Sequence, residues 1–600
     1  MRYLTAFALL MAGTSAEGTV AYGIDLTAPG HHTATVTAEF PQTSGPYLDV
    51  MMPAWRTGRY TIMNLASGVS QFAATDAAGN PLPFEKIDKS TWRVRLSSPT
   101  AVHVRYELYA NELGSRSRHI DDSHAYLDAS AVFMYADRYR GDDVSVSLKV
   151  PAGWKSFSGM DSPAAERFVA ANWDVLVDSP IETGIEKTAN FTEGSRDYEL
   201  VVWGDGNYDI GKMAADLKKI VAQTPSIWSS YPFKRYVFMV HTIDSGGGAT
   251  EHRNSTVIQF PRYWFQPADL YQRFLSTAAH EFIHTWNVKA YRNAAMVPYR
   301  YQAENYTDLL WLEEGSTEYF TDPFLVRAGL MTPTEYFGAL AKLIDANRNR
   351  PGRLVQSVAQ ASWDEWISTS DRERSLNAWV NIYSEGEIAS WMLDIALLQE
   401  TGGKVSYRDV HEQLYKRFGD GKTGFTDADI LQILHELAGH SWDQWWMTHI
   451  RAPIAPDFDA LLAPVGLKLV YPDSGAPKAW AGWQGSEAEG GIHLDAVQKG
   501  SPAWDAGFGA DDLLVAIDGE RMSPRRFQSI LAEHKVGDTV SVSFFRRDKL
   551  MQKTLKLGSS IGSPKVVPVD RPTRAQKALF QRWLLVPYPR NEKGGQRPPF

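Results

Sequence analysis

The sequence predicts a multidomain α+β protein. With 600 residues the chain is too long for a single hydrophobic core, so several domains are expected. Hydrophobicity alternates with a period of two in the first third, helical periods dominate from about residue 209 to 462, and small residues become frequent near 476. These changes predict a β-rich N-terminal domain (20–204), a mainly helical domain (205–475), a small domain (476–558) and a C-terminal tail (559–600).

The N-terminal domain shows the clearest strand pattern. Turn-forming residues such as Ala-Ala-Gly-Asn-Pro at 77–81 separate the alternating segments, which favours an all-β domain. The segments with the strongest alternation are 33–40, 91–96, 101–108 and 144–150.

Composition excludes some classes of function and leaves one open. Charged residues make up 22% and hydrophobic residues 44%, as in soluble globular proteins. The net charge of −9 comes with no basic stripe, so we expect no nucleic-acid partner. The 20 Trp residues would also suit stacking on sugars, so a carbohydrate-binding protein stays open on composition alone.

The N-terminus predicts export. A basic start at Met1-Arg2-Tyr3 precedes an apolar run from Leu4 to Ala12 and small residues ending at Ala16, which is typical of a signal peptide over 1–16. No other stretch is long and apolar enough for a membrane span. The absence of Cys excludes disulfides and a lipidated cysteine, so we expect a periplasmic or secreted, unanchored protein.

The segment Thr277–Thr285 contains the pattern H-E-x-x-H within a Gly- and Pro-free apolar run. Each helical residue turns by about 100°, so His280 and His284 lie on one face and can hold one Zn²⁺. Glu281 then lies beside the metal, where it can accept a proton from the attacking water. A chance match on a helix surface is the alternative, but the apolar neighbours predict a buried helix, where unpaired polar groups are costly.

A third ligand is expected on a second predicted helix, 311–320. Glu314 and Glu318 are four residues apart and therefore share a face. One can bind zinc while the other accepts a hydrogen bond from a ligand histidine. An ordinary solvated acidic face is disfavoured because Trp311, Leu312 and Tyr319 make the segment apolar.

A similar pattern downstream is not expected to bind metal. In His435-Glu436-Leu437-Ala438-Gly439-His440 the two histidines are five residues apart and diverge by about 140° on a helix. Thr426 with Asp429 resembles a capping box, and Gly439 a helix C-terminus. We expect a structural helix.

The order W-L-x-E-G-x-T-x-Y-F after H-E-x-x-H resembles the glycyl aminopeptidase family of zinc peptidases, relatives of aminopeptidase N. The resemblance implies a thermolysin-like catalytic domain with one zinc per chain, Glu314 as the third ligand and Glu318 as the partner of a ligand histidine. The gap of 30 positions from His284 to Glu314 favours the glycyl branch. The run Pro53–Tyr60 resembles the N-terminal-domain signature of the family.

Two more segments resemble functional motifs of this clan. Gly246–His252 is similar to its exopeptidase motif, which implies that Glu251 binds the α-amine of the substrate and that Gly247 and Gly248 lie along the peptide. Asn381–Gly386 resembles the segment that carries the catalytic tyrosine, so Tyr383 is expected to donate a hydrogen bond to the oxyanion. Glu385 stands where relatives often have a basic residue.

The region 480–557 resembles a bacterial PDZ domain in the order G-S-P-A, A-G, D-x-L, I-D-G. The resemblance implies a carboxylate-binding loop at Trp480, Ala481, Gly482 and Trp483 and a C-terminal peptide ligand. A PDZ domain that only packs on the catalytic domain is equally compatible with the sequence. Because every catalytic candidate precedes Ala476, we expect loss of this domain to leave hydrolysis of small substrates largely intact. In the tail, 575–585 is expected to be helical.

The combined prediction is an exported zinc metallo-aminopeptidase that acts on peptides with a free N-terminus. The family implies a preference for Gly or Ala at that end. A zinc endopeptidase remains the alternative among enzymes, and a PDZ-based adaptor with an inactive peptidase domain remains the alternative outside them.

Overall fold

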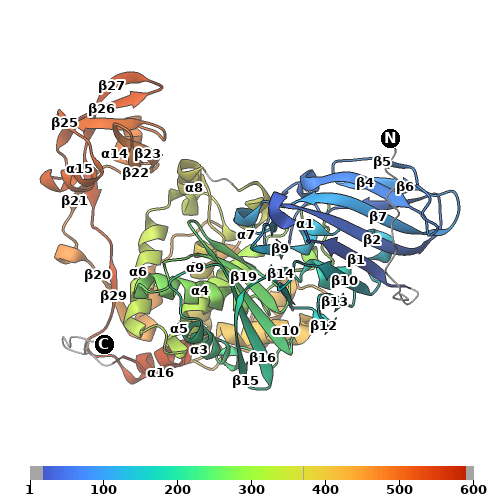
Figure 1. The fold of residues 1–600 in the computed structure, drawn as a ribbon. Coiled ribbons are helices and arrows are strands. Elements are labelled where there is room, and N and C mark those ends of the chain that lie inside the picture. The colour runs from blue at the N-terminus through green and yellow to red at the C-terminus, as the bar shows by residue number, and fades with distance from the viewer. Residues whose placement is uncertain (1–17, 369–370, 590–600) are drawn as a thin grey trace. The chain divides into compact units, whose positions relative to one another are not determined.

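A computed structural model describes residues 18–368 and 371–589, and Figure 1 shows its elements. The chain forms two compact units, and each is considered by itself. Among the described residues, unit 1 contains the chain up to Ala215 together with Phe233–Leu270 and Arg300–Glu304, and unit 2 contains the others. The predicted signal peptide, 1–16, lies outside the described residues.

Unit 1 begins with a β-rich region, as the sequence predicted. Three sheets lie before residue 185 (Figure 1). The largest sheet has seven strands in the order β12 (Asp161–Ala164), β13 (Arg167–Ala170), β10 (Val144–Lys149), β1 (Val20–Asp25), β2 (Thr33–Thr43), β7 (Thr100–Tyr109) and β4 (Val69–Thr75). The smaller sheets are β3 (Tyr47–Met51), β6 (Thr91–Arg95) and β5 (Phe84–Lys86), and β11 (Lys155–Ser158), β14 (Ile181–Gly184), β9 (His124–Leu127) and β8 (Arg118–Ile120).

The alternation in the sequence becomes a buried face of strand β2. Alternate residues of this strand are buried, so one face packs on the core and the other reaches solvent. Val36 lies opposite Ile24 of β1 and Tyr106 of β7, and all three are almost completely buried. The register therefore places the apolar set of each strand on the same side of the sheet.

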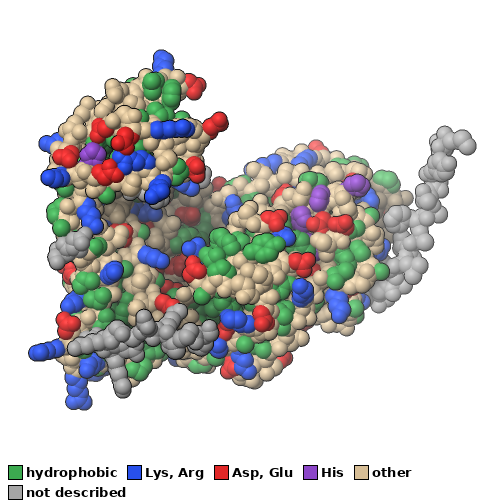
Figure 2. All heavy atoms as spheres, turned by 60° about the vertical axis from the view of Figure 1, so that its left-hand side comes forward, with side chains coloured by type: hydrophobic (Ala, Val, Ile, Leu, Met, Phe, Trp, Pro, Cys, Tyr) green, Lys and Arg blue, Asp and Glu red, His purple; other side chains and the backbone are tan. Residues whose placement is uncertain are grey.

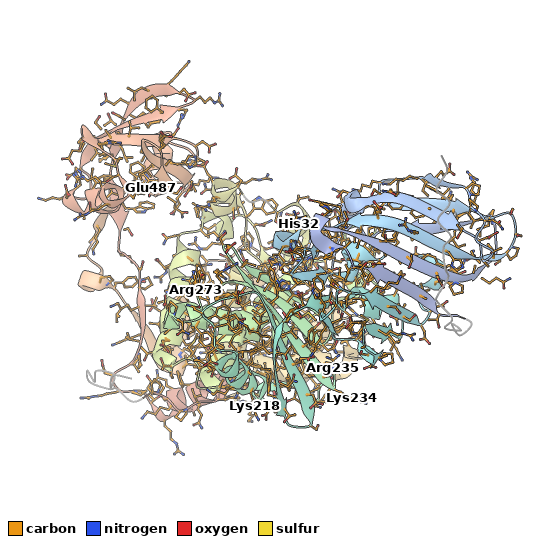
Figure 3. All side chains as sticks on the ribbon, viewed as in Figure 1. His32, Lys218, Lys234, Arg235, Arg273 and Glu487 are labelled. Carbon is orange, nitrogen blue, oxygen red and sulfur yellow. The ribbon has the colours of Figure 1, made fainter. Side chains whose placement is uncertain are left out.

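A five-stranded mixed sheet completes unit 1. Its order is β15 (Lys187–Glu193), β16 (Arg196–Trp203), β17 (Arg235–Ile243), β19 (Ser255–Pro261) and β18 (Gly248–Glu251). Strands β16, β17 and β19 are parallel, and β18 runs antiparallel at the end of the sheet. Arg235, labelled in Figure 3, donates hydrogen bonds to the carbonyls of Ser158 and Met160 at 2.6 and 2.8 Å and so joins β17 to the end of β11.

Strands β17 and β19 were not predicted from the sequence, in which mainly helical periods follow residue 209. Strand β17 is buried along almost its whole length and β19 along all of it. Strands buried on both faces lack the alternation that marks a half-buried strand. Their apolar runs therefore carry no signal at period two.

Unit 2 is largely helical, as predicted. Helix α3 (Ile210–Val221) and helix α4 (Ala268–Ile283) both run from unit 1 into unit 2. The helices that follow are α5 (Ser316–Arg327), α6 (Pro333–Arg348), α7 (Val358–Asp364), α8 (Arg372–Ala378), α9 (Ser384–Glu400), α10 (Tyr407–Phe418), α11 (Asp427–Ala438), α12 (Asp443–His449) and α13 (Phe458–Leu462). Helix α6 starts at a capping box between Thr332 and Glu335, with Pro333 in its first turn.

A small β-rich domain follows at 476–558 (Figure 1). Its sheet has the order β22 (Trp483–Ala488), β23 (Gly491–Val497), β24 (Leu513–Ile517), β26 (Thr539–Arg546) and β27 (Lys549–Lys556). The short helices α14 (Pro502–Asp505) and α15 (Pro524–Ser529) complete it. Its entering and leaving segments pair with each other, β20 (Leu467–Val470) with β29 (Lys565–Pro568) and β21 (Lys478–Trp480) with β28 (Gly558–Ser560).

The C-terminal helix α16 (Arg574–Leu584) docks on the helical region, close to the helix predicted at 575–585. The Trp583 ring stacks on Trp391 of α9 at 6.3 Å between centroids, and its indole N–H donates to the Tyr319 hydroxyl at 2.7 Å. Arg408 of α10 donates to the Trp583 carbonyl at 2.9 Å. The helix is therefore held by both apolar packing and hydrogen bonds.

The surface agrees with the composition. In Figure 2, acidic and basic side chains are scattered over the face shown, without a continuous basic stripe. Within the described ranges, no helix combines the length and the apolar character that a bilayer span requires.

Candidate metal and catalytic site

The two histidines of the H-E-x-x-H pattern converge at the C-terminal end of α4. His280 is in the last turn, and His284 continues the helical hydrogen bonding because its N–H donates to the His280 carbonyl at 3.2 Å. Both side chains are buried, and their Nε2 atoms face each other at 3.0 Å. Two imidazole nitrogens at this distance need a cation between them or a shared proton.

The second nitrogen of each ring faces an oxygen atom. His284 Nδ1 donates to the Asn287 carbonyl at 3.0 Å, which leaves Nε2 as the electron-pair donor. His280 Nδ1 lies 3.6 Å from Glu318 Oε1. Metal-binding histidines are oriented by such outer partners. The structure thus places the Glu318 carboxylate near the Nδ1 atom of His280.

Glu314 brings a carboxylate to the histidine pair. Its Oε2 lies 3.3 Å from His284 Nε2 and 3.7 Å from His280 Nε2, so a single oxygen faces both rings. These three residues form one of the groups in the described chain whose ligand atoms are close enough to share a metal ion.

The local structure around Glu314 differs from the single α-helix that the sequence predicted. Residues Trp311–Gly315 form a π-helical turn, and α5 begins at Ser316. A π turn removes ordinary i to i−4 bonds and is frequent at functional sites. Glu314 and Glu318 still lie on the side of the histidines, Glu314 facing both rings and Glu318 facing His280.

Asn287, which the sequence analysis did not single out, supports the π turn. Its side-chain amide donates to the carbonyls of Leu312 and Glu313 at 3.1 and 2.9 Å and to the Thr317 hydroxyl at 3.0 Å. The same residue supplies the backbone carbonyl for His284. The only signal in the sequence is its place three residues after the second histidine.

The electrostatics of this site favour a bound cation. Burial opposes ionisation of Glu314, but the imidazoles of His284 and His280 lower its pKa well below the usual range. Burial also disfavours the charged form of His280, yet the carboxylates of Glu318, Glu314 and Glu281 raise its pKa well above its ordinary value. The surroundings of His280 therefore stabilise positive charge at this point.

The donor set fits zinc. Two imidazole nitrogens and one carboxylate oxygen are the protein ligands of many catalytic zinc sites, which keep a further position open for water. The distances of 3.0 to 3.7 Å between these donor atoms are close to the edge of a tetrahedron with bonds of about 2.1 Å, which is roughly 3.4 Å.

Two more predicted residues lie near the histidines. Glu281 is buried next to His280 on α4, and its charge contributes to the raised pKa of that imidazole. Tyr383 precedes the first residue of α9, and its ring centroid lies 6.4 Å from that of His280. The structure thus brings together His280, Glu281, His284, Glu314, Glu318 and Tyr383.

A second histidine–carboxylate group in unit 1 has a different geometry. His124 and His241 each face a different oxygen of Glu182, at 2.7 and 2.8 Å, and all three side chains are buried. Burial opposes ionisation of Glu182, but the two imidazoles lower its pKa to about 2. One oxygen for each N–H is the geometry of two hydrogen bonds, whereas a single Glu314 oxygen faces two nitrogens. The His280 group is therefore the better candidate for a metal site of the two.

Glu251, the candidate amine-binding residue, lies in unit 1 at the end of strand β18 and is buried. Its carboxylate packs against Gly58 of the segment 53–60. A Cβ atom on Gly58 would lie 2.4 Å from Glu251 Oε2, and the backbone of this glycine has a φ of 78°. Only glycine fits there, which explains its presence beside the carboxylate.

Asp178 holds these two segments together and was missed in the sequence. It accepts hydrogen bonds from the Thr57 hydroxyl and from the Arg253 N–H, each at 3.2 Å, and its Oδ1 lies 3.2 Å from His252 Nδ1. Since Thr57 precedes Gly58 and His252 follows Glu251, Asp178 connects the two backbone segments that carry Gly58 and Glu251. An isolated aspartate in a loop gives no signal of this in the sequence.

The two candidate glycines before Glu251 lie against an arginine. A Cβ atom on Gly248 would lie 2.2 Å from Arg116 Nη1. Arg116 donates to the Gly247 carbonyl at 3.4 Å and to the Thr250 hydroxyl at 3.3 Å. Because these glycines have no side chain, the Arg116 side chain can approach strand β18.

The predicted PDZ loop joins β21 to the edge strand β22. Trp480 ends β21 and Trp483 begins β22, where its ring stacks on Phe527 of α15 at 6.0 Å. Gly482 has a φ of 83°, and a Cβ atom there would lie 2.1 Å from Ser501 Cβ. Ala481 is completely buried, and its carbonyl accepts the Ala503 N–H at 2.9 Å.

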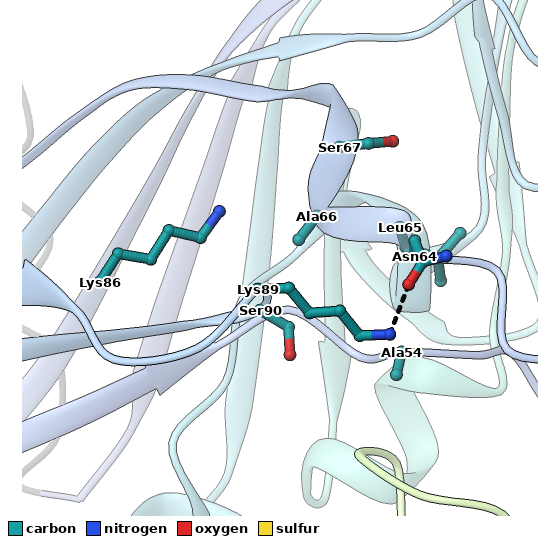
Figure 4. Close-up of a pocket in the computed structure, with 8 residues that line it drawn as sticks. All are labelled: Ala54, Asn64, Leu65, Ala66, Ser67, Lys86, Lys89 and Ser90. Carbon is teal, nitrogen blue, oxygen red and sulfur yellow. Dashed lines mark hydrogen bonds between the residues drawn. The ribbon is translucent and has the colours of Figure 1, made fainter.

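Two other features lie apart from these residues. The second H-E pattern lies at the exposed end of α11, which begins at the predicted capping box and has Gly439 as its C-cap, so the predicted helix is confirmed. A pocket in unit 1, shown in Figure 4, is lined by none of the predicted site residues. Its lining residues are Ala54, Asn64, Leu65, Ala66, Ser67, Lys86, Lys89 and Ser90.

Comparison with protein families gives three matches. Residues 21–185 match the peptidase M61 N-terminal domain, 273–389 match the M61 glycyl aminopeptidase, and 481–557 match a PDZ domain. The second segment includes the His-His-Glu group and Tyr383, whereas Glu251 lies between the first two segments. The PDZ fold and the α+β organisation predicted from the sequence are thus confirmed.

Solved and curated proteins extend these matches. An aminopeptidase N family protein from Idiomarina loihiensis is 26% identical, with a TM-score of 0.87 over 94% of this chain and 100% of that one. An M1 zinc metallopeptidase from Deinococcus radiodurans is 13% identical, with a TM-score of 0.44 over 70% of this chain and 90% of that one. The serine protease Do-like HtrA of Bacillus subtilis (strain 168) is 36% identical over 75 residues, which span 12% of this chain and only 17% of that relative.

Proposed function

We propose a zinc aminopeptidase activity for this chain, which belongs to the M61 glycyl aminopeptidase family of metallopeptidases. The observation that carries the proposal is the convergence of two imidazole nitrogens and one carboxylate oxygen within 3.7 Å of one another. One zinc per chain would be held by His280, His284 and Glu314. When bound there, the metal would polarise the scissile carbonyl and lower the pKa of water.

The protein residues would move and stabilise charge around that centre. Glu281 would accept a proton from the attacking water and deliver it to the leaving amine. Tyr383 would donate a hydrogen bond to the oxyanion of the tetrahedral intermediate. Glu318 would orient His280 by accepting a hydrogen bond from its Nδ1 atom, which requires the separation of 3.6 Å to shorten slightly.

Glu251 is the residue that favours an aminopeptidase over an endopeptidase. The α-amine of a peptide is cationic below a pKa of about 8, and a carboxylate binds it by a charge-assisted hydrogen bond. The Glu251 carboxylate lies against Gly58, and Asp178 bonds to Thr57 and His252, the neighbours of Gly58 and Glu251 in the chain. Strand β18 ends its sheet, so a peptide main chain could add beside Gly247 and Gly248.

The finer features of the function follow from the family and the N-terminal sequence. We propose a preference for Gly or Ala at the N-terminus of the substrate, as the family implies. The signal-peptide pattern over 1–16 supports export to the periplasm or the medium. The PDZ domain supports a C-terminal peptide ligand at the Trp480–Trp483 loop.

An adaptor with an inactive peptidase domain is the less favoured function. It would need none of the metal ligands, yet both histidines, Glu314 and Glu281 are present and buried together.

The test uses the full mature chain with a panel of aminoacyl-p-nitroanilides, the N-acetylated form of each and peptides with blocked ends. We expect hydrolysis of free-amine substrates, best for Gly or Ala, and one zinc per chain by metal analysis. Cleavage of blocked internal peptide bonds at similar rates would replace the aminopeptidase with an endopeptidase. No hydrolysis by the zinc-loaded protein would favour the adaptor.

A further inference from the structure

We propose that Arg350 and Glu385 are positioning residues for Tyr383 and that they connect this tyrosine to the PDZ domain through helix α8. The catalytic part of the proposal rests on the proposed function, because it assumes that Tyr383 acts on the oxyanion. The connection itself rests only on contacts within unit 2.

Helix α8 is hydrogen-bonded to the main chain of the PDZ domain. The Glu373 carboxylate accepts the N–H of Val497 at 3.3 Å through one oxygen and the N–H of Ala510 at 3.1 Å through the other. Asn377 donates to the Val497 carbonyl at 2.8 Å and accepts the N–H of Lys499 at 2.7 Å. Two side chains of one short helix thus bind four main-chain groups.

The ion pair between Arg372 and Asp495 adds a third contact at 2.9 Å, but the Arg372 side chain is largely exposed, so this pair contributes little. Asn377 is buried, and its two hydrogen bonds are therefore the more important ones. They hold α8 to the end of β23 and the loop that follows it.

Tyr383 lies in the short connection between α8 and α9. Five residues, 379–383, separate the two helices. The connection is held at Val380, whose N–H donates to Gln356 Oε1 at 2.8 Å. The connection also passes close to Gly352, where a Cβ atom would lie 2.4 Å from the Trp379 carbonyl oxygen. Because this connection is short, a movement of α8 would also displace Tyr383.

Arg350 bridges the two helices directly. Its Nη1 donates to the Ser375 carbonyl of α8 at 3.1 Å, and its Nε lies 3.2 Å from Glu385 Oε1 in the first turn of α9. The Arg350 side chain is about one-fifth exposed and that of Glu385 only 7%. This partly desolvated pair is less screened by solvent than a surface pair.

Glu385 connects Arg350 to the residues at the start of α9. Its Oε2 accepts the Asn381 N–H at 3.1 Å and the Ser384 hydroxyl at 2.8 Å. Asn381 Oδ1 in turn accepts the Tyr383 N–H at 2.8 Å. Glu385 therefore stabilises the turn that carries Tyr383. This gives a role to an acidic residue at a position where relatives often have a basic one.

These contacts change the expected effect of the PDZ domain on the hydrolysis of small substrates. The sequence alone predicts that its loss leaves small-substrate hydrolysis largely intact. The bonded path from Val497 through α8 to Tyr383 predicts that weakening the PDZ contact lowers kcat, with little change in KM or in metal content.

The experiment uses the full chain with Asn377→Ala, which removes both hydrogen bonds to the PDZ main chain. The matched control is Gln552→Ala on β27, the strand at the far edge of the sheet of the same domain, which removes one exposed amide bonded to Ser541 of β26. Hydrogen exchange of the peptide 379–387 is measured first, since it needs no activity. Then kcat, KM and zinc content are measured, and each variant is repeated with Tyr383→Phe.

The expected results distinguish the two proposals. Asn377→Ala should speed exchange at 379–387 and lower kcat on the order of threefold to thirtyfold, whereas Gln552→Ala should do neither. In the Tyr383→Phe background Asn377→Ala should have no further effect on kcat. Glu385→Gln should reproduce the loss with zinc retained.

Unchanged exchange at 379–387, or an equal loss of kcat with and without the Tyr383 hydroxyl, would overturn the positioning role. A chain that shows faster exchange but hydrolyses no free-amine substrate even as wild type would keep the α8 connection and refute the aminopeptidase.

Discussion

Gly315 and Gly386 meet backbone to backbone beside the metal site. A Cβ atom on Gly315 would lie 2.3 Å from the carbonyl carbon of Gly386, and one on Gly386 would lie 2.7 Å from the Trp311 carbonyl oxygen. Gly315 follows Glu314, the proposed third ligand, and Gly386 lies three residues after Tyr383. One contact therefore sets the distance between the turn that carries the carboxylate and the helix that follows the tyrosine.

We predict that Gly386→Ala disturbs zinc binding and catalysis together. The added methyl group meets backbone rather than a flexible side chain, so the turn and α9 must separate, which costs about 1–3 kcal/mol as overpacking. We expect a lower Tm, weaker zinc retention on dialysis and a lower kcat.

The control is Gly338→Ala on α6, an exposed helical glycine with no atom within 4 Å of the added Cβ. This change should be neutral or stabilising by about 0.5–1 kcal/mol. If Gly386→Ala behaves like this control, the close contact is not what holds the site.

Metal binding and proton transfer should separate in two variants. His284→Ala removes a ligand, so we expect loss of both zinc and activity. Glu281→Gln keeps the shape of the side chain but cannot accept a proton, so zinc should remain while turnover falls by about 10²–10⁴-fold. Zinc content and single-substrate kinetics decide the matter, and near-native turnover of Glu281→Gln would show that another group is the base.

The sequence predicted those features that depend on local periodicity. The alternation of 33–40 places Val36 and its neighbours on one face of β2, and the spacing of four places His280 and His284 together. The sequence also predicted the capped helix α11 and the C-terminal helix. Each of these depends on residues that are near one another in the chain.

The features that the sequence missed depend on contacts between distant residues. The π turn at 311–315 is stabilised by the amide of Asn287, 24 residues before its first residue, and by Gly386, 71 residues after its last. Asp178 fixes the segment around Gly58 from more than 100 positions away. No periodic pattern in a single sequence reports such pairs.

A substitution at Asn287 tests its support of the π turn separately from its support of His284. Asn287→Ala removes the donor to the Leu312 and Glu313 carbonyls but keeps the backbone carbonyl that accepts from His284. We expect zinc affinity to fall by about 10- to 100-fold, as for other residues that orient ligands. Competition with a chelator measures it, and unchanged affinity would show that the turn forms without this amide.

Tyr383→Phe should impair the chemical step alone. The change removes one hydroxyl and little volume, so folding and zinc content should survive. Loss of one oxyanion donor should lower kcat by about 10²–10³-fold with a smaller effect on KM. A KM effect larger than the kcat effect would instead indicate that the hydroxyl binds the substrate in its ground state.

Glu251 decides between an aminopeptidase and an endopeptidase. Glu251→Gln keeps the volume that packs against Gly58 but removes the negative charge, so the loop held by Asp178 should stay in place. Since the substrate amine is a cation, kcat/KM for free-amine p-nitroanilides should fall by about 10-fold or more, in line with the loss of a charge-assisted hydrogen bond. Zinc content should not change, and N-acetylated substrates should be poor for both proteins. Equal rates for wild type and Glu251→Gln on free-amine substrates would mean that another group binds the N-terminus, and the preference for exopeptidase action would lose its structural basis.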